Sequence, residues 1–106
     1  MGQLLPPEEN AKLRDALFRY YRRTGERARQ LRESKNLSQS EVAHRCGLSD
    51  DTVEKVEKGQ VPIGGKIVER LAKAIGVLEK QIWPPANEFP ELQLPPDPVA
   101  EGEQTD

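Results

Sequence analysis

Apolar and small side chains recur at steps of three and four residues through the first third of the chain. The positions are Leu13, Leu17, Tyr20, Tyr21, Thr24, Ala28 and Leu31. This spacing predicts a helix, and Pro6-Pro7 followed by Glu8-Glu9 favours its start, because acidic residues stabilise the positive end of the helix dipole. One helix over 8–35 would be roughly 42 Å long, too long for a small domain unless its first half packs elsewhere. We therefore expect a break at Thr24-Gly25, since glycine disfavours a helix interior and threonine can cap a new start.

Two short helices joined by a tight turn are predicted next. The sequence Ser38-Gln39-Ser40-Glu41 has the pattern of a capping box, and Cys46-Gly47 provides a glycine that can close the helix in the left-handed conformation. Ser49 can cap a second helix that carries Asp50-Asp51 in its first turn and stops at Gly59. The two helices together form a helix-turn-helix.

A fourth amphipathic helix follows Pro62-Ile63 and is closed by Gly76. Its apolar positions are Ile67, Leu71, Ala72 and Ile75. Residues 77–83 predict a last short helical turn, which Pro84-Pro85 stops. We expect Trp83 to cover the end of the bundle and Cys46 to be a structural thiol in the core.

Charge is distributed unevenly along the 106 residues, whose formal net charge is -2. Residues 1–83 hold all 16 Lys and Arg against 12 acidic residues, whereas residues 84–106 hold six acidic residues and six prolines with no basic residue. The last segment has few apolar residues, so we expect an acidic, Pro-rich, disordered tail. Basic residues are crowded at Arg19, Arg22, Arg23, Arg27, Arg29, Arg32 and Lys35. This stretch suits a polyanion partner or simply a solvated helix face.

Several functional classes are disfavoured by what the sequence lacks. The chain has one cysteine, Cys46, and one histidine, His44, so we expect no disulfide framework and no metal site. It has no apolar run long enough to span a membrane and no apolar signal-peptide core, and we expect a cytoplasmic protein. The sequence shows no nucleophile beside a base and no carboxylate pair in a credible context. Gly64-Gly65 is not followed by the Lys-Ser/Thr pair of a P-loop, so it does not indicate a phosphate-binding loop. We expect no enzyme activity and no cofactor.

The sequence resembles the Cro and phage-repressor type of helix-turn-helix domain, often called XRE-like. The resemblance runs without gaps from Gly25 to about Trp83. It is carried by L-S-Q-S-E-V-A-H-R-C-G-L-S, by V-E-K-G, and by P-I-G-G-K-I-V-E-R-L-A-K-A-I-G-V. It implies a compact bundle of five helices whose third helix, about Ser49 to Lys58, enters a major groove of DNA.

The resemblance also implies roles for individual residues. Gln39 corresponds to a glutamine that clamps a phosphate, and Lys58 and residues 60–66 would lie near the second phosphate strand. The positions that read bases or contact the groove are Asp50, Asp51, Thr52 and Lys55. Arg32 and Glu57 correspond to a partly buried ion pair.

The third helix departs from the family pattern because its expected outer face is acidic. That face carries Asp50, Asp51, Glu54 and Glu57 against Lys55 and Lys58. Carboxylates are repelled by phosphates unless an aspartate accepts a hydrogen bond from a cytosine amino group. Asp50 and Asp51 can equally be explained as stabilising charges at a helix N-terminus.

These observations predict an all-α protein. We expect an extra N-terminal helix in residues 1–23, a repressor-like helix-turn-helix domain in 24–83 and a disordered tail in 84–106. The expected function is sequence-specific transcription regulation on double-stranded DNA, as a homodimer. Two alternatives remain: a protein-interaction module of the same fold that has lost DNA binding, and an antitoxin whose tail binds a partner enzyme.

Overall fold

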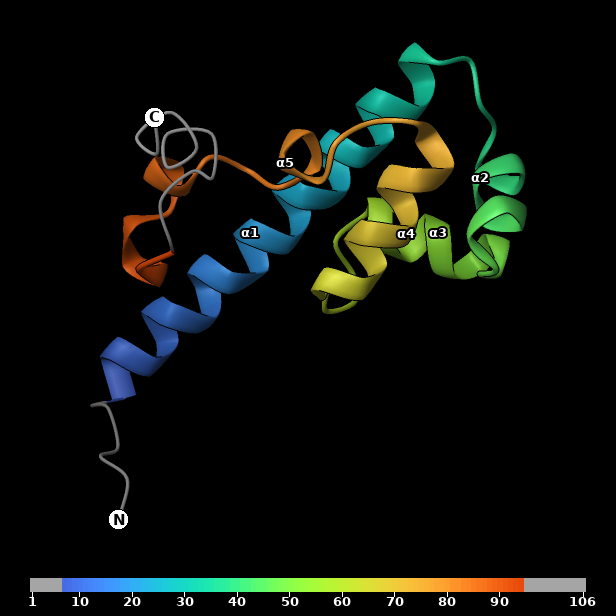
Figure 1. Cartoon of the computed structure of the whole chain (residues 1–106). Helices are drawn as coiled ribbons and strands as arrows, with labels where there is room; N and C mark the ends of the chain where they lie inside the picture. Colours follow the sequence, from blue (N-terminus) through green and yellow to red (C-terminus); the bar gives the residue numbers. More distant parts are fainter. Residues whose placement is uncertain (1–6, 95–106) are drawn as a thin grey trace, which may run out of the picture.

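The computed structural model describes residues 7–94, which form five α-helices followed by two short 3-10 turns (Figure 1). The helices are α1 (Pro7–Ser34), α2 (Gln39–Cys46), α3 (Asp50–Glu57), α4 (Gly65–Ile75) and α5 (Glu79–Ile82), and the turns are η1 (Ala86–Glu88) and η2 (Pro90–Leu92). The prediction of an all-α, five-helix fold is therefore confirmed for this part of the chain. Within residues 7–94, no helix is both long and apolar enough to cross a membrane.

Helix α1 runs through Thr24-Gly25 without a break, so the predicted interruption is wrong and the extra N-terminal helix is simply the first half of α1. The Thr24 hydroxyl is buried and donates to the Tyr20 carbonyl oxygen at 2.7 Å, one turn back in the same helix. Gly25 is needed for packing, since a Cβ there would lie 2.1 Å from the Val56 carbonyl oxygen. Glycine at this position lets the end of α3 lie directly against α1.

The first half of α1 packs against the segment that follows α5. Phe89 is buried between the two, and its ring meets the Tyr20 ring edge-on with centroids 5.2 Å apart. Trp83 stacks on Tyr20 from α5, with centroids 5.8 Å apart. The expectation of disorder is therefore wrong for residues 84–94, because the Phe89 ring and ion pairs of Glu88 and Glu91 with arginines of α1 anchor this segment. The remaining part of the predicted tail, residues 95–106, lies outside the described residues.

The core lies between α1, α2, α3 and α4, and α5 covers one end of it. Its fully buried aliphatic side chains are Val42, Val53, Val56, Val68, Leu71 and Ile82. The Cys46 thiol is buried with them and donates to the Val42 carbonyl oxygen, and burial raises the pKa of this thiol. The prediction of a structural cysteine is thus confirmed. Trp83 packs against the same core as a half-buried side chain.

Candidate nucleic-acid interface

Helices α2 and α3 form a helix-turn-helix whose ends are fixed by caps. The Ser38 hydroxyl accepts from the Glu41 backbone N–H at 3.0 Å, and the Glu41 carboxylate accepts from the Ser38 N–H at 2.9 Å. These two bonds complete the predicted capping box, and the bond that the Ser38 backbone N–H donates lowers the pKa of the Glu41 carboxyl. Gly47 closes α2 in the left-handed conformation at φ 69°, and Ser49 caps α3. The turn between the helices therefore has a defined geometry.

Helix α3 buries its apolar side and exposes a polar one. Val53, Val56 and Glu57 are buried, so the expectation that Glu57 belongs to the outer acidic face is wrong. The polar side carries the residues to which the sequence assigned groove contacts. These are Asp50, Asp51, Thr52, Lys55 and Lys58, and Glu54 lies beside them.

Each charged group on the polar side of α3 has a partner within the protein. Lys55 Nζ lies 3.1 Å from Asp51 Oδ2, and Lys58 Nζ lies 2.7 Å from Glu54 Oε2. Both pairs join residues four positions apart and are well exposed, and such pairs contribute about 0.3 to 0.5 kcal/mol each. A phosphate can replace the carboxylate at little cost, so both lysines remain available for DNA.

Asp50 and Thr52 are also held by neighbours in the turn. The Ser40 hydroxyl hydrogen-bonds Asp50 Oδ2, which ties the start of α2 to the start of α3. The Thr52 hydroxyl lies 2.8 Å from the Ser49 hydroxyl at the cap. The bond between Ser40 and Asp50 spans ten residues, and no sequence pattern indicated it. Base reading by Asp50 would require this bond to be exchanged or shared.

Arg32 and Glu57 form a bidentate ion pair inside the domain. Arg32 Nε donates to Glu57 Oε2 at 2.7 Å and Nη2 donates to Oε1 at 3.1 Å, and the two side chains are only 10% and 3% exposed. The hydrogen bond to Glu57 raises the pKa of the Arg32 guanidinium. The third nitrogen, Nη1, donates to the Leu37 carbonyl oxygen at 2.7 Å. One side chain therefore links α1, the loop before α2 and the end of α3.

Gln39 belongs to the same network, which the sequence did not reveal. Its amide nitrogen donates to Glu57 Oε1 at 2.9 Å, and the residue is half-buried at the first position of α2. An amide nitrogen has two N–H groups, so the second is left for another acceptor. The buried pair thus holds the Gln39 side chain at the start of α2.

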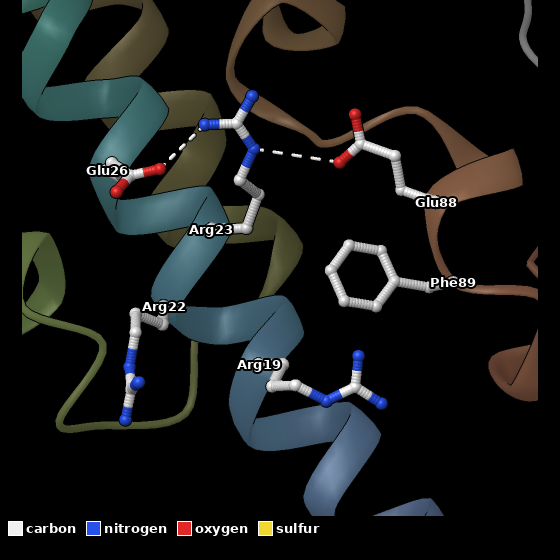
Figure 2. A pocket seen from close by; sticks show the side chains of 6 residues that line it. All are labelled: Arg19, Arg22, Arg23, Glu26, Glu88 and Phe89. Atoms are coloured by element: carbon white, nitrogen blue, oxygen red, sulfur yellow. Dashed lines mark hydrogen bonds and ion pairs between the residues drawn. The ribbon is translucent and has the colours of Figure 1, made fainter.

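The basic stretch of α1 does not form one continuous positive surface, because internal contacts divide it. Arg27 donates to the Ile82 carbonyl oxygen and Arg29 pairs with Glu33. Arg23 Nη1 lies 2.6 Å from Glu26 Oε1, and Arg23 Nε lies 3.6 Å from Glu88 Oε1. Figure 2 shows the guanidinium between these two carboxylates.

Arg19, Arg22 and Arg23 line an open pocket of about 270 Å³ together with Phe89. The guanidinium carbon of Arg19 lies 5.9 Å from the Phe89 ring centroid, and Arg19 Nη2 donates to Glu91 at 2.9 Å. Arg22 points away from these groups in Figure 2. Acidic residues 88 and 91 therefore neutralise part of the basic stretch. Among the described residues, no group of three or more His, Cys, Asp or Glu could hold a metal ion.

Comparisons with known proteins agree with this geometry. A family model described as a helix-turn-helix domain matches residues 23–82. The control protein C.BamHI of Bacillus amyloliquefaciens is 34% identical over 59 residues, which cover 55% of this chain and 73% of that protein.

Two solved structures are similar in both sequence and fold. The restriction-modification controller protein C.AhdI of Aeromonas hydrophila has a TM-score of 0.57 at 32% identity, covering 59% of this chain and 96% of that one. The hypothetical transcription factor NHTF of Neisseria has a TM-score of 0.59 at 28% identity, covering 87% of this chain and 95% of that one. The second likeness extends well beyond the residues of the family match.

Proposed function

Because the chain belongs to the helix-turn-helix domain family and is a DNA-binding transcription regulator rather than an enzyme, we propose that it reads a specific operator as a homodimer. In this proposal Gln39 and Lys58 contact phosphates, and the first turns of α3 face the bases. The base-facing residues are Asp50, Asp51, Thr52 and Lys55.

The observation that supports the proposal most is the rigid presentation of α3. Caps at Ser38, Gly47 and Ser49 fix the turn. The buried contact between Arg32 and Glu57 holds α3 against α1, and the bond from Gln39 to Glu57 joins α2 to them. The polar side of α3 is left uncovered by the rest of residues 7–94. A short helix held in this way is the element that family members insert into the major groove.

A dimer is part of the proposal because one such helix makes few contacts. Lys55 and Lys58 offer only two positive charges from α3, and each is already paired with a carboxylate. Two copies on adjacent half-sites double the phosphate contacts, and the second binding event becomes intramolecular. Affinity should therefore fall steeply with added salt.

Binding to the gene's own upstream DNA tests the proposal. We would titrate the full chain against labelled upstream DNA and a scrambled duplex by fluorescence anisotropy at about 50 mM and 200 mM salt. The proposal expects saturable binding that is much weaker with the scrambled sequence and weaker at the higher salt concentration. Equal affinity for both duplexes would contradict sequence-specific recognition.

Substitutions of Lys55 and Gln39 should separate base reading from phosphate contact. We expect Lys55→Ala to lose about 1 to 3 kcal/mol of discrimination at one guanine, because a lysine can donate to its O6 and N7 atoms. Gln39→Ala should weaken all duplexes about equally.

Lys73→Ala is the matched control, since Lys73 is also an exposed lysine paired with a glutamate one turn away, but on α4. Anisotropy titrations would measure the affinity of all three variant proteins for a set of operator duplexes that differ at single base pairs. A Lys55→Ala protein with the same base preferences as the Lys73→Ala control would show that Lys55 does not read a base.

One observation favours a second candidate, a protein-interaction module with no DNA binding. The exposed polar side of α3 carries three carboxylates, from Asp50, Asp51 and Glu54, and such a face suits a basic protein surface. This alternative expects wild-type protein to show no DNA binding even at about 50 mM salt. If this alternative is right, changing the three acidic residues to lysine would create DNA binding. If the proposed function is right, the same change would alter the base preference of a protein that already binds DNA.

A further inference from the structure

The segment after α5 lies along the first half of α1 and brings carboxylates to its arginines (Figure 1). We call residues 86–92, which contain η1 and η2, the acidic strap. Glu91 Oε2 lies 2.9 Å from Arg19 Nη2, and Glu88 Oε1 lies 3.6 Å from Arg23 Nε. The four side chains are 35% to 48% exposed. Two arginines that face solvent are therefore paired with carboxylates from a distant part of the sequence.

The acidic strap is held on α1 by an apolar anchor as well as by its charges. Phe89 is 5% exposed, and its ring packs edge-on against Tyr20. A buried aromatic pair of this kind stabilises far more than exposed ion pairs, whose contribution is small. The anchor therefore keeps Glu88 and Glu91 at a high local concentration beside the arginines, even when either carboxylate turns away.

Each of the two arginines has carboxylates on two sides. Arg19 also pairs with Asp15, and Arg23 also pairs with Glu26, in both cases within α1. With the acidic strap in place, each guanidinium thus faces two carboxylates, and the local charge is negative and repels a phosphate. Without the carboxylates of the strap, one exposed partner would remain, and a phosphate can replace such a partner at little cost.

Arg22 lies on the same face of α1 and has no carboxylate partner. It is three positions from Arg19 and next to Arg23, and the three arginines line one open pocket. Among residues 7–94, no hydrogen bond or ion pair involves the exposed Arg22 side chain. Figure 2 shows this side chain pointing away from Glu88 and Phe89. The acidic strap therefore covers two of the three arginines and leaves the third free among the described residues.

The uncovered arginine adjoins the end of the helix that we propose enters the groove. Gly59 follows Lys58 with φ 68°, and a Cβ at Gly59 would lie 2.5 Å from the Arg22 Cα atom. The backbone of α1 at Arg22 is therefore packed against the chain just after α3. Lys58 is a proposed phosphate contact, so the three arginines continue a positive surface from this point along α1. A duplex seated on α3 carries further phosphates past its end.

We propose that Arg19, Arg22 and Arg23 form an accessory phosphate-binding face for DNA, and that Glu88 and Glu91 of the acidic strap mask two of these arginines. The inference rests on the proposed function and extends it, because it adds contacts to the backbone of the same duplex. Phosphate contacts carry no sequence information. The mask therefore lowers the affinity for every duplex, which limits retention of the protein on DNA that lacks its operator.

The test removes the charges of the acidic strap and keeps its anchor. Glu88→Gln with Glu91→Gln, the strap variant, leaves Phe89 in place. The matched control is Glu69→Gln with Glu79→Gln, which changes the net charge equally at exposed positions of α4 and α5. Fluorescence anisotropy would measure the affinity of the full chains for the scrambled duplex between about 50 and 300 mM salt.

The strap variant should bind the scrambled duplex more tightly and with a steeper dependence on salt. Two more phosphate contacts should steepen the fall of log affinity with log salt concentration by about 1.8, since each contributes about 0.9. At about 50 mM salt we expect a gain on the order of tenfold over the wild type, and a change within about threefold for the control. An unchanged slope, or an equal gain in the control, would overturn the mask.

A second change shows which arginines gain contact with the DNA. Arg19→Gln with Arg23→Gln should alter the affinity of the wild type by less than about threefold, because both arginines are masked there. The same change in the strap variant should abolish the whole gain. A gain that survives this change, or an equal loss in both backgrounds, would contradict the accessory face.

Upstream DNA in parallel titrations separates this inference from the proposed function. Equal affinity of the wild type for upstream and scrambled duplexes, together with the gain in the strap variant, would refute sequence-specific recognition only. Preference for the upstream duplex without any gain in the strap variant would refute the mask only. Absence of binding by the wild type and the strap variant at about 50 mM salt would contradict both.

Discussion

Replacing Gly25 with alanine should destabilise the fold by roughly 3 to 5 kcal/mol, a loss at the upper end of what single substitutions cause. The new Cβ would lie 2.1 Å from the Val56 carbonyl oxygen and 2.8 Å from the Glu57 carbonyl oxygen. Both obstacles are backbone atoms, so α3 must move away from α1 as a unit. Alanine gains about 1 kcal/mol of helix propensity over glycine, which is smaller than the cost of separating two packed helices.

Gly65→Ala is the control for this prediction, because Gly65 is also helical but a Cβ there meets nothing within 4 Å. It should leave stability unchanged or raise it by up to about 1 kcal/mol. Thermal unfolding followed by circular dichroism should show the melting temperature of Gly25→Ala lowered by on the order of 15 to 30 °C. Equal melting temperatures for the two variants would mean that α1 and α3 adjust at no cost.

The sequence was sufficient to predict α2, α3 and α4 because their ends are set by local chemistry. Ser38 and Ser49 cap the starts of α2 and α3, and Gly47 and Gly76 close α2 and α4 in the left-handed conformation, all through contacts within a few residues. Their apolar positions then follow from helical spacing. No knowledge of distant residues was required.

The same local reasoning failed at Gly25 and at Phe89, where distant contacts decide the outcome. Glycine weakens a helix interior by about 1 kcal/mol, but here the domain gains the close approach of α3, which the sequence around Gly25 does not encode. Composition indicated disorder after residue 83 because apolar residues are few. One phenylalanine against Tyr20, with Glu88 and Glu91 on arginines of α1, was enough to hold residues 84–94.

In the candidate interface, too, the sequence predicted the positions of residues but not the contacts between distant residues. Resemblance to a family placed Gln39 at the start of α2 and Lys55 on the outer side of α3, and the structure has them there. The bonds that hold these side chains could not be predicted, since Gln39 to Glu57 and Ser40 to Asp50 join different helices. The roles of these residues toward DNA stay predictions.

Arg32→Ala should destabilise the domain by about 3 to 5 kcal/mol, because it leaves a buried carboxylate without its cation. Glu57 would retain only the bond from the Gln39 amide, and the Leu37 carbonyl oxygen would lose its donor. Arg32→Lys should recover only part of this loss, since an ammonium cannot bridge both carboxylate oxygens as the guanidinium does. Arg29→Ala is the matched control, because the pair between Arg29 and Glu33 is exposed and worth about 0.5 kcal/mol or less.

A double variant, Arg32→Met with Glu57→Leu, separates the stability of the pair from its effect on Gln39. Apolar side chains of similar size often replace a buried ion pair at little net cost, so urea unfolding should show most of the Arg32→Ala loss restored. The DNA affinity of the double variant should remain below that of the wild type, because the Gln39 amide would no longer be anchored by Glu57 at the start of α2. Stability and DNA affinity restored together would show that the ion pair supports only the fold, and an Arg32→Ala protein as stable as Arg29→Ala would contradict the energetic argument itself.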